Sequence, residues 1–384
     1  MDFVFNWLLG ISTLFGMSHG ELFYVASQIK NESPHEWRAA FFEHAANLDN
    51  NATVAVGERR QELAAQYYLG AAYANKAALQ FTDPATPDYS EGVKVMESTF
   101  LLGAKHLGAP IAPIDVPYRD TTLPAYYLKI DDMPRPTLIM IGGGDTSRED
   151  LFYFAGYPGW KRGYNVLMVD LPGQGNNPGR GLPFTAQTNE AVSASLDWIE
   201  KQDKHISDIA IYGVSGGGYF TAQAVEHDKR IKAWIASTPI YDIAEVFRKE
   251  FGAALKTSGW LMNGILKLVG KFNESANINL KKYAWQFGAI DFASAVVEVL
   301  KQAKPVAYDK ITCPALFMMG ENDGAELQRQ TRSLYDSLTE RGLPVTMRVF
   351  TAEEGADAHC QVNNFRLAHL TVFDWLDATF NYKG

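Results

Sequence analysis

The stretch "IYGVSGGGYF" (Ile211–Phe220) decides the fold class, because it places a serine among glycines at the point where an apolar run ends. The preceding residues "DIAIY" have strand composition, and the following "GYFTAQAVEHD" has helix composition. A strand-to-helix turn of the form Gly-x-Ser-x-Gly lifts the serine hydroxyl clear of a sheet, and its glycines avoid steric clashes. The context therefore predicts that Ser215 is a nucleophile rather than part of an ordinary glycine-rich loop.

Short apolar runs that stop at a Gly, Pro or Asp turn recur on both sides of this stretch. They are "DTTLPAYYLKI", "RPTLIMIGGG", "YNVLMVDLPGQG", "IKAWIASTP", "CPALFMMGEND" and "PVTMRVFTAEEG". Most of them are separated by helix-length segments such as "TAQTNEAVSASLDWIEKQ". Strands that alternate with helices in this way predict an α/β fold, in which a mostly parallel sheet carries helices on both faces.

Two regions depart from the alternation and have helical periodicity instead. Residues 34–81 place apolar side chains at three- and four-residue intervals, and a further helix is expected to start near Ser90. We therefore expect a helical, cap-like N-terminal region over residues 1–120. The α/β core is expected in two parts, 121–240 and 310–384, separated by a helical lid insertion over 241–309.

An apolar stripe marks the middle of the predicted insertion. Its residues recur at near-helical spacing in "WLMNGILKLVGKF" and are Trp260, Leu261, Ile265 and Leu268. Such a stripe has to be buried against another surface. The sequence leaves four surfaces open: the sheet edge, the N-terminal helices, the substrate, or a second subunit of a homodimer.

A serine nucleophile needs backbone N–H donors for the negative charge that develops on the substrate oxygen. Gly216 follows the serine at the start of a helix and is the first expected donor. The second is expected from the loop "MIGGGDTSRED" after an earlier strand, which offers Gly144, with Asp145 as the alternative.

A base has to accept the serine proton, and in this type of fold it follows the nucleophile and the acid along the chain. His359, in the loop "TAEEGADAHCQV" after a predicted strand, has this position. His369 lies within the predicted C-terminal helix, where a packing role is the simpler interpretation. His359 is therefore the expected base.

The acid that orients the base is expected at a strand end between Ser215 and His359. Asp323 in "FMMGENDGAEL" directly follows a strand, so its side chain can project toward the histidine loop. The runner-up is Glu321. Asp357 is the weaker alternative, because closeness in sequence to His359 does not make the two side chains face each other.

Composition and charge narrow the classes of partner and compartment. A net charge of -9 over 384 residues argues against nucleic-acid binding, and the apolar N-terminus is too short and interrupted to span a membrane. Only two cysteines, Cys313 and Cys360, favour a reduced, cytoplasmic protein without a disulfide framework. The sequence has no phosphate-loop motif and no closely spaced His/Cys set, so no cofactor and no metal is expected.

At this point the sequence resembles a known family. The segments that carry the resemblance are "QYYLGAAYANKAALQF", "PTLIMIGGGDTSRED", "VDLPGQGNNP", "GVSGGGYF", "GENDGAEL" and "EGADAHC". They are similar to the α/β-hydrolase superfamily, and within it to the branch of 2,6-dihydroxypseudooxynicotine hydrolase, the fungal pigment chain-shortening hydrolases and the fermentation–respiration switch protein. The resemblance covers most of the chain from about residue 35 onward.

The resemblance implies an α/β-hydrolase fold with Ser215 as nucleophile, Asp323 as acid and His359 as base. It also implies that Gly144 and Gly216 are the oxyanion donors. Some members of the branch use an acidic residue near the lid entry to cleave a carbon–carbon bond beside a ketone. Here the segment "TPIYDIAEVFRKEF" offers three such carboxylates: Asp242, Glu245 and Glu250. A solvated helix face is the alternative interpretation of all three.

These features predict a serine hydrolase that forms an acyl-enzyme with a small, largely apolar or aromatic acyl or ketone substrate. Carbon–carbon hydrolysis of a β-diketone or aryl ketone is one outcome that the resemblance implies. An esterase or thioesterase and a peptidase would use the same triad. A hydrolase-like binding or regulatory protein is the rival from another class, because a fold alone does not fix a function.

Overall fold

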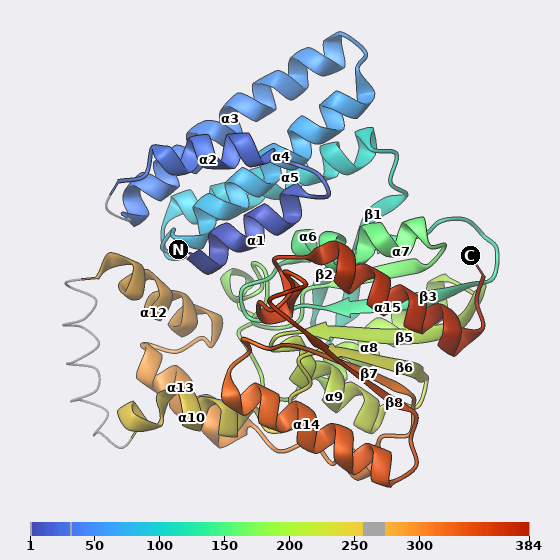
Figure 1. The fold of residues 1–384 in the computed structure, drawn as a ribbon. Helices are drawn as coiled ribbons and strands as arrows, with labels where there is room; N and C mark the ends of the chain where they lie inside the picture. Colours follow the sequence, from blue (N-terminus) through green and yellow to red (C-terminus); the bar gives the residue numbers. More distant parts are fainter. Residues whose placement is uncertain (1, 31–32, 256–272, 384) are drawn as a thin grey trace. The chain divides into compact units, whose positions relative to one another are not determined.

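A computed structural model of the chain describes residues 2–30, 33–255 and 273–383 (Figure 1). The chain divides into two compact units, which are Met1–Pro110 with Thr257–Ala295, and Ile111–Lys256 with Val296–Gly384. The first unit is helical and the second contains the sheet. Residues 241–309, the expected insertion, contribute to both units. The stripe formed by Trp260, Leu261, Ile265 and Leu268 lies outside the described residues.

The described part of the first unit consists of helices joined by short connections. They are α1 (Asp2–Ser12), α2 (His19–Ser27), α3 (Pro34–Gly57), α4 (Gln61–Gln80), α5 (Pro87–His106) and α12 (Glu274–Gln286), and α13 (Phe292–Gln302) crosses the unit boundary. The start of α3 shows why these boundaries form. Ser33 accepts a hydrogen bond from the Glu36 N–H at 3.4 Å, and Pro34 fits the first turn because that turn needs no proline N–H.

The core of this unit forms where α4 packs between α3 and α5. The buried face of α4 is rich in alanine, which lets the neighbouring helices approach closely. A Cβ at Gly103 of α5 would lie only 2.7 Å from Leu69 Cγ of α4, so a side chain could not be accommodated there without movement. Trp37 of α3 donates its indole N–H to the Ala77 carbonyl at 2.8 Å, which satisfies its polar atom inside the core.

The apolar N-terminal segment forms α1 and packs on α2 and α4. Its Trp7, Leu8 and Ile11 side chains are buried. This arrangement agrees with a segment that folds onto the helical unit. Across the described residues, the structure contains no helix with both the length and the apolar character needed to cross a bilayer.

The second unit is built on an eight-stranded sheet with the order β1-β2-β4-β3-β5-β6-β7-β8. The strands are β1 (Ile111–Tyr118), β2 (Thr121–Leu128), β3 (Arg135–Ile141), β4 (Asn165–Val169), β5 (Ile206–Val214), β6 (Ile231–Ser237), β7 (Ala315–Gly320) and β8 (Val345–Phe350). The first two strands form an antiparallel hairpin, and β2 is antiparallel to β4. From β4 to β8 all pairs are parallel, so the carboxyl ends of these strands meet at one edge.

Helices cover both faces of the sheet, with α7 and α15 on one face and α8, α9 and α14 on the other (Figure 1). Their bounds are α6 (Arg148–Leu151), the π-helix η1 (Phe152–Gly156), α7 (Tyr157–Lys161), η2 (Pro178–Arg180), α8 (Asn189–Gln202), α9 (Gly217–His227), α10 (Ile243–Leu255), η3 (Tyr308–Lys310), α14 (Ala325–Glu340), η4 (His359–Gln361) and α15 (Phe365–Phe380). The predicted parallel sheet with helices on both faces is confirmed. Strands β3, β4, β5 and β7 are almost wholly buried, which explains their continuous apolar runs.

Candidate active site

The turn that carries Ser215 joins the end of β5 to the start of α9. Ser215 has a φ of +54°, a left-handed conformation that is costly for a residue with a side chain. Its N–H donates to the Ser237 carbonyl at 2.7 Å, which ties the turn to the end of the neighbouring strand β6. A strained serine between a strand and a helix is the geometry expected of a nucleophile elbow.

The glycines beside Ser215 are required by close approaches of the backbone. A Cβ at Gly217 would lie 2.6 Å from the Ile141 carbonyl oxygen at the end of β3. A Cβ at Gly143 would lie 2.6 Å from Ser215 Cβ and 3.0 Å from its Oγ. The end of β3 therefore runs directly against the turn, with no room for side chains between them.

The two expected oxyanion donors lie close together at this contact. From Gly216, a Cβ would stand 3.8 Å from the Gly144 nitrogen and 3.7 Å from Gly143 Cα. The alternative donor, Asp145, follows in an exposed bend. The sequence thus placed Gly144 and Gly216 on two different strand ends, and the structure brings their backbones to the same side of the elbow.

His359 and Asp323 face each other from the loops that follow β8 and β7. His359 Nδ1 contacts Asp323 Oδ1, and the second carboxylate oxygen accepts the Gly320 N–H at 2.7 Å. The Asp323 side chain is fully buried, whereas that of His359 is 27% exposed. The buried carboxylate is therefore fixed by the strand end behind it and orients one ring nitrogen of the histidine.

The two alternative acids have other partners. Glu321 Oε1 accepts the Ala352 N–H at 2.7 Å. Asp357 accepts hydrogen bonds from the amides of Asn322 and Asn363, the latter at 2.9 Å. Asp357 thereby ties the acid loop to the histidine loop, and its carboxylate is directed to two amides.

His369, the other late histidine, belongs to α15 and packs against η1. Its Nε2–H donates to the Tyr153 carbonyl at 2.7 Å. Burial lowers the pKa of its imidazole to about 4, so the ring is neutral near pH 7. This is the structural role that its place in a predicted helix indicated.

The environment of His359 shifts its proton affinity upward. Burial lowers the pKa, but Cys360 and the Asp323 carboxylate outweigh it, and the net pKa lies well above the ordinary value of 6.5. The Cys360 thiol donates to the Ser237 carbonyl at 3.2 Å, which is the behaviour of a neutral S–H. We therefore attribute the raised pKa chiefly to the Asp323 carboxylate.

Three carboxylates at the start of the predicted insertion differ in their contacts. Asp242 accepts the Glu245 N–H at 3.0 Å and so caps α10, while Glu245 pairs with Arg248 at 3.1 Å on the helix surface. Partial desolvation raises the pKa of the Glu250 carboxyl, although its side chain stays exposed, and the charge of His359 lowers it. Of the three, Glu250 is the carboxylate with an electrostatic interaction with His359.

Sequence reasoning missed the contacts that join the serine turn to the histidine loop. The Ser237 carbonyl accepts both the Ser215 N–H and the Cys360 S–H. The Ser237 hydroxyl donates to Gln361 Oε1 at 2.9 Å, and both of these side chains are buried. No local pattern could have revealed them, because residues from three separate segments meet only after the sheet is assembled.

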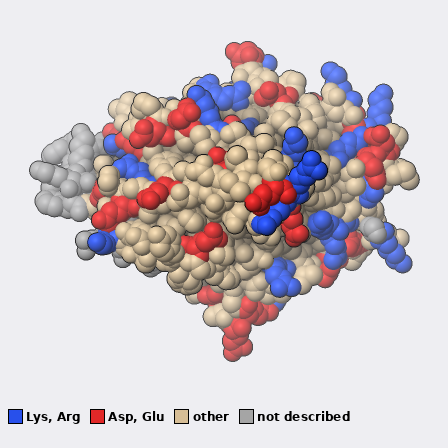
Figure 2. All heavy atoms as spheres, turned by 90° about the horizontal axis from the view of Figure 1, so that it is seen from above, with Lys and Arg blue, Asp and Glu red and all other residues tan. Residues whose placement is uncertain are grey.

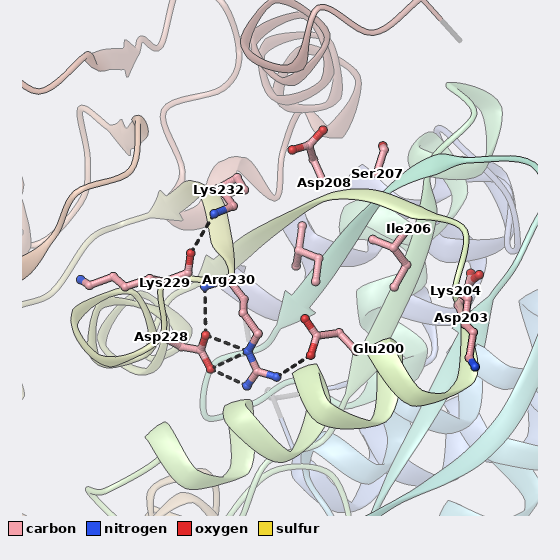
Figure 3. A pocket seen from close by; sticks show the side chains of 11 residues that line it. Glu200, Asp203, Lys204, Ile206, Ser207, Asp208, Asp228, Lys229, Arg230 and Lys232 are labelled. Carbon is pink, nitrogen blue, oxygen red and sulfur yellow. Dashed lines mark hydrogen bonds and ion pairs between the residues drawn. The ribbon is translucent and has the colours of Figure 1, made fainter.

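A hollow of about 620 Å³ lies at the other ends of β5 and β6, and Figure 3 shows the side chains that line it. Arg230 there is bound by Asp228 at 2.6 Å and by Glu200 at 2.9 Å. Lys232 donates to the Lys229 carbonyl at 3.1 Å. Ligands of open α/β sheets bind at the carboxyl ends of the strands, so this hollow, at the amino ends, is not a candidate active site.

The described residues contain no group of three or more His, Cys, Asp or Glu side chains arranged to hold a metal ion. On the face drawn in Figure 2, basic and acidic side chains are interspersed. The candidate chemistry of the second unit is therefore concentrated at the serine turn, the histidine loop and the glycines of β3.

Comparisons with known proteins agree with this geometry. Residues 117–353 match the family described as X-Pro dipeptidyl-peptidase (S15 family). The chain is similar to 20-hydroxy-prefusarin hydrolase FUS2 of Gibberella moniliformis, with 28% identity over 100% of this chain and 97% of that protein. It is also similar to the alpha/beta hydrolase psoB of Aspergillus fumigatus, with 26% identity over 100% of this chain and 93% of the other.

A solved structure extends the comparison to the fold. The crystal structure of 2,6-dihydroxy-pseudo-oxynicotine hydrolase matches with a TM-score of 0.71 and 17% identity, covering 99% of this chain and 97% of the other. At this level of identity, the match speaks for the fold. The α/β-hydrolase fold and the branch that the sequence resembles are thereby confirmed.

Proposed function

The chain belongs to the X-Pro dipeptidyl-peptidase (S15) family and is an α/β-hydrolase, and on this premise we propose that it is a serine hydrolase. Ser215 is the nucleophile, His359 the base and Asp323 the acid that orients it. Gly144 and Gly216 donate their N–H groups to the oxyanion. The observation that carries the proposal is the contact between His359 and Asp323, at strand ends that follow an elbow serine in chain order.

The proposed reaction has two half-reactions. Ser215 Oγ attacks a substrate carbonyl carbon while His359 accepts the hydroxyl proton. The tetrahedral intermediate collapses, its leaving group takes the proton from His359, and an acyl-enzyme remains. A water molecule, deprotonated by His359, then attacks the acyl carbon and releases a carboxylic acid and free Ser215.

The substrate class follows from the relatives only as a proposal. Their names describe hydrolases of fungal products and of a pseudo-oxynicotine, and both point to largely apolar or aromatic carbonyl compounds. We propose such a substrate here. The family description keeps a peptidase in the test, beside an esterase, a thioesterase and a non-catalytic binding protein.

A panel of carbonyl substrates tests the proposal. It contains an aryl ester, a thioester, a β-diketone and an X-Pro amide, each assayed with the wild type and with Ser215→Ala. We expect turnover of at least one substrate by the wild type. We expect Ser215→Ala to lose about 10⁶-fold in kcat, as in other serine hydrolases, with its circular dichroism unchanged. A Ser215→Ala variant that keeps more than a few per cent of activity would contradict the assignment.

Carbon–carbon hydrolysis is the second candidate, and Glu250 is the observation that favours it. Expulsion of a carbon leaving group produces a carbanion that needs a proton, and a carboxyl with a raised pKa is a suitable donor. Under this proposal Glu250→Gln lowers β-diketone cleavage far more than ester hydrolysis. The matched control is Glu245→Gln on the same helix, whose carboxylate pairs with Arg248. Equal effects of both variants on both reactions would remove Glu250 from the mechanism.

A further inference from the structure

A buried glutamine lies behind the glycines of the proposed oxyanion hole. Gln174 belongs to the loop after β4 and is 3% exposed. Its Nε2 donates to the Gly142 carbonyl at 2.5 Å and to the Gly143 carbonyl at 3.2 Å. Its Oε1 accepts the Leu171 N–H at 2.9 Å. The amide orientation is fixed by these partners, because carbonyls only accept hydrogen bonds and a backbone N–H only donates.

The contact with Gly143 sets the direction of the next N–H group. In a trans peptide the C=O of one residue and the N–H of the next point in opposite directions. The peptide bond between Gly143 and Gly144 is trans. When Gln174 holds the Gly143 carbonyl on its own side, the Gly144 N–H is therefore directed away from Gln174.

The elbow lies close to that peptide. The Gly143 backbone runs against Ser215, and the Gly144 nitrogen is 3.8 Å from the Cβ position of Gly216. Resting on the proposed function, we propose that Gln174 is a positioning residue that fixes the Gly143–Gly144 peptide so that the Gly144 N–H serves as an oxyanion donor. Fixed donors stabilise a developing oxyanion because they need no reorganisation during the reaction.

The loop around Gln174 is itself held in place. Asn177 is fully buried and donates to the carbonyls of Asp170 at 2.8 Å and Leu171 at 3.1 Å. Gly175 has a φ of +53°, and a Cβ there would lie 2.2 Å from Asp170 Oδ2. Buried amides are costly unless every polar atom is satisfied. Here the cost is met by contacts that end on the two glycine carbonyls of β3.

Gln174→Glu tests the donor directly, because it keeps the side-chain length and Oε1 but places a second acceptor against two carbonyls. We expect kcat to fall about 10- to 100-fold, less than for removal of an oxyanion donor itself, with KM changed less than about twofold. The affinity for an aryl trifluoromethyl ketone, whose hemiketal oxyanion occupies the hole, should fall by the same factor as kcat. The affinity for the carboxylate product should stay unchanged.

The matched control is Gln223→Glu. Gln223 is another buried glutamine of this unit, and its Nε2 donates to the Ala186 carbonyl at 2.7 Å, away from β3. This variant should lose stability without loss of kcat on the folded fraction. If Gln174→Glu does not fold, Gln174→Met removes the donor without adding charge, and the same ratios are read from it. A kcat on the folded fraction equal to that of the wild type, or a loss matched by Gln223→Glu, overturns the proposal.

A crystal structure of the wild-type protein with the trifluoromethyl ketone bound separates this inference from the proposed function. We expect a hemiketal on Ser215 whose oxygen lies about 2.7–3.1 Å from the Gly144 nitrogen, with Gln174 still bound to the Gly143 carbonyl. An adduct on Ser215 whose oxygen is bound elsewhere overturns the role of Gln174 and leaves the nucleophile intact. An adduct on another residue contradicts the proposed function, and the role of Gln174 with it.

Discussion

His359 Nδ1 contacts Oδ1 of the fully buried Asp323, whose second oxygen accepts the Gly320 N–H at 2.7 Å. This contact fixes which ring nitrogen is occupied by the acid, so Nε2 is the nitrogen that can exchange a proton with Ser215. The arrangement also makes the imidazolium more stable than it would be in water, because the negative charge beside it cannot move away.

Replacement of the acid is expected to separate Asp323 from its neighbour Asp357. Asp323→Asn should lower kcat about 10⁴-fold, because the amide favours the wrong tautomer of His359. Asp357→Asn should change kcat less than about tenfold, since its carboxylate binds Asn322 and Asn363. Steady-state kinetics of both variants on one substrate measure this. The reverse ranking would transfer the acid role to Asp357.

The pH dependence of kcat/KM should report the raised pKa of His359. The base has to be neutral to accept a proton, so activity should rise with pH through an apparent pKa above 6.5. The same group stabilises the folded state fully below pH 6.5, and this contribution is lost as pH rises through the folded-state pKa. A pH–rate profile with its acid limb centred below 6.5 would contradict the pKa shift.

His369 should have the opposite effect on stability. Its pKa of about 4 lies below the unfolded value of 6.5, so protonation favours the unfolded chain. Stability should therefore be constant above pH 6.5 and fall as pH decreases toward 4, by on the order of 2 kcal/mol for this half-buried ring. Urea unfolding of the wild type and of His369→Gln measures this difference. An equal acid sensitivity of the two proteins would assign the loss to other groups.

The sequence predicted seven of the eight strands of the sheet, because buried parallel strands need continuous apolar runs and these are visible locally. It missed β1, which contains Pro113 and Pro117 and is half exposed at the sheet edge. Proline weakens a strand pattern but is tolerated at an edge, where its missing N–H costs no ladder bond. The start of α5 was also misplaced: the helix begins at Pro87 rather than near Ser90, because proline fits the first helical turn.

The candidate site was predictable only as far as each residue follows a strand. Ser215, Asp323 and His359 each stand after an apolar run, so their order along the chain could be interpreted directly. Ser237 and Gln174 could not be found in this way, because their roles depend on carbonyls that other segments bring to them. Their partners are set by the order of the strands in the sheet, which no local pattern states.

The most direct test of the central claim is covalent labelling of Ser215 by a fluorophosphonate. This probe reacts only with a serine that an adjacent base activates, so heat-denatured protein and Ser215→Ala are the controls. The account predicts one adduct per chain in the folded wild type, located by peptide mass spectrometry on the segment that contains Ser215. Absence of an adduct from the folded protein, or equal labelling of Ser215→Ala, would contradict it.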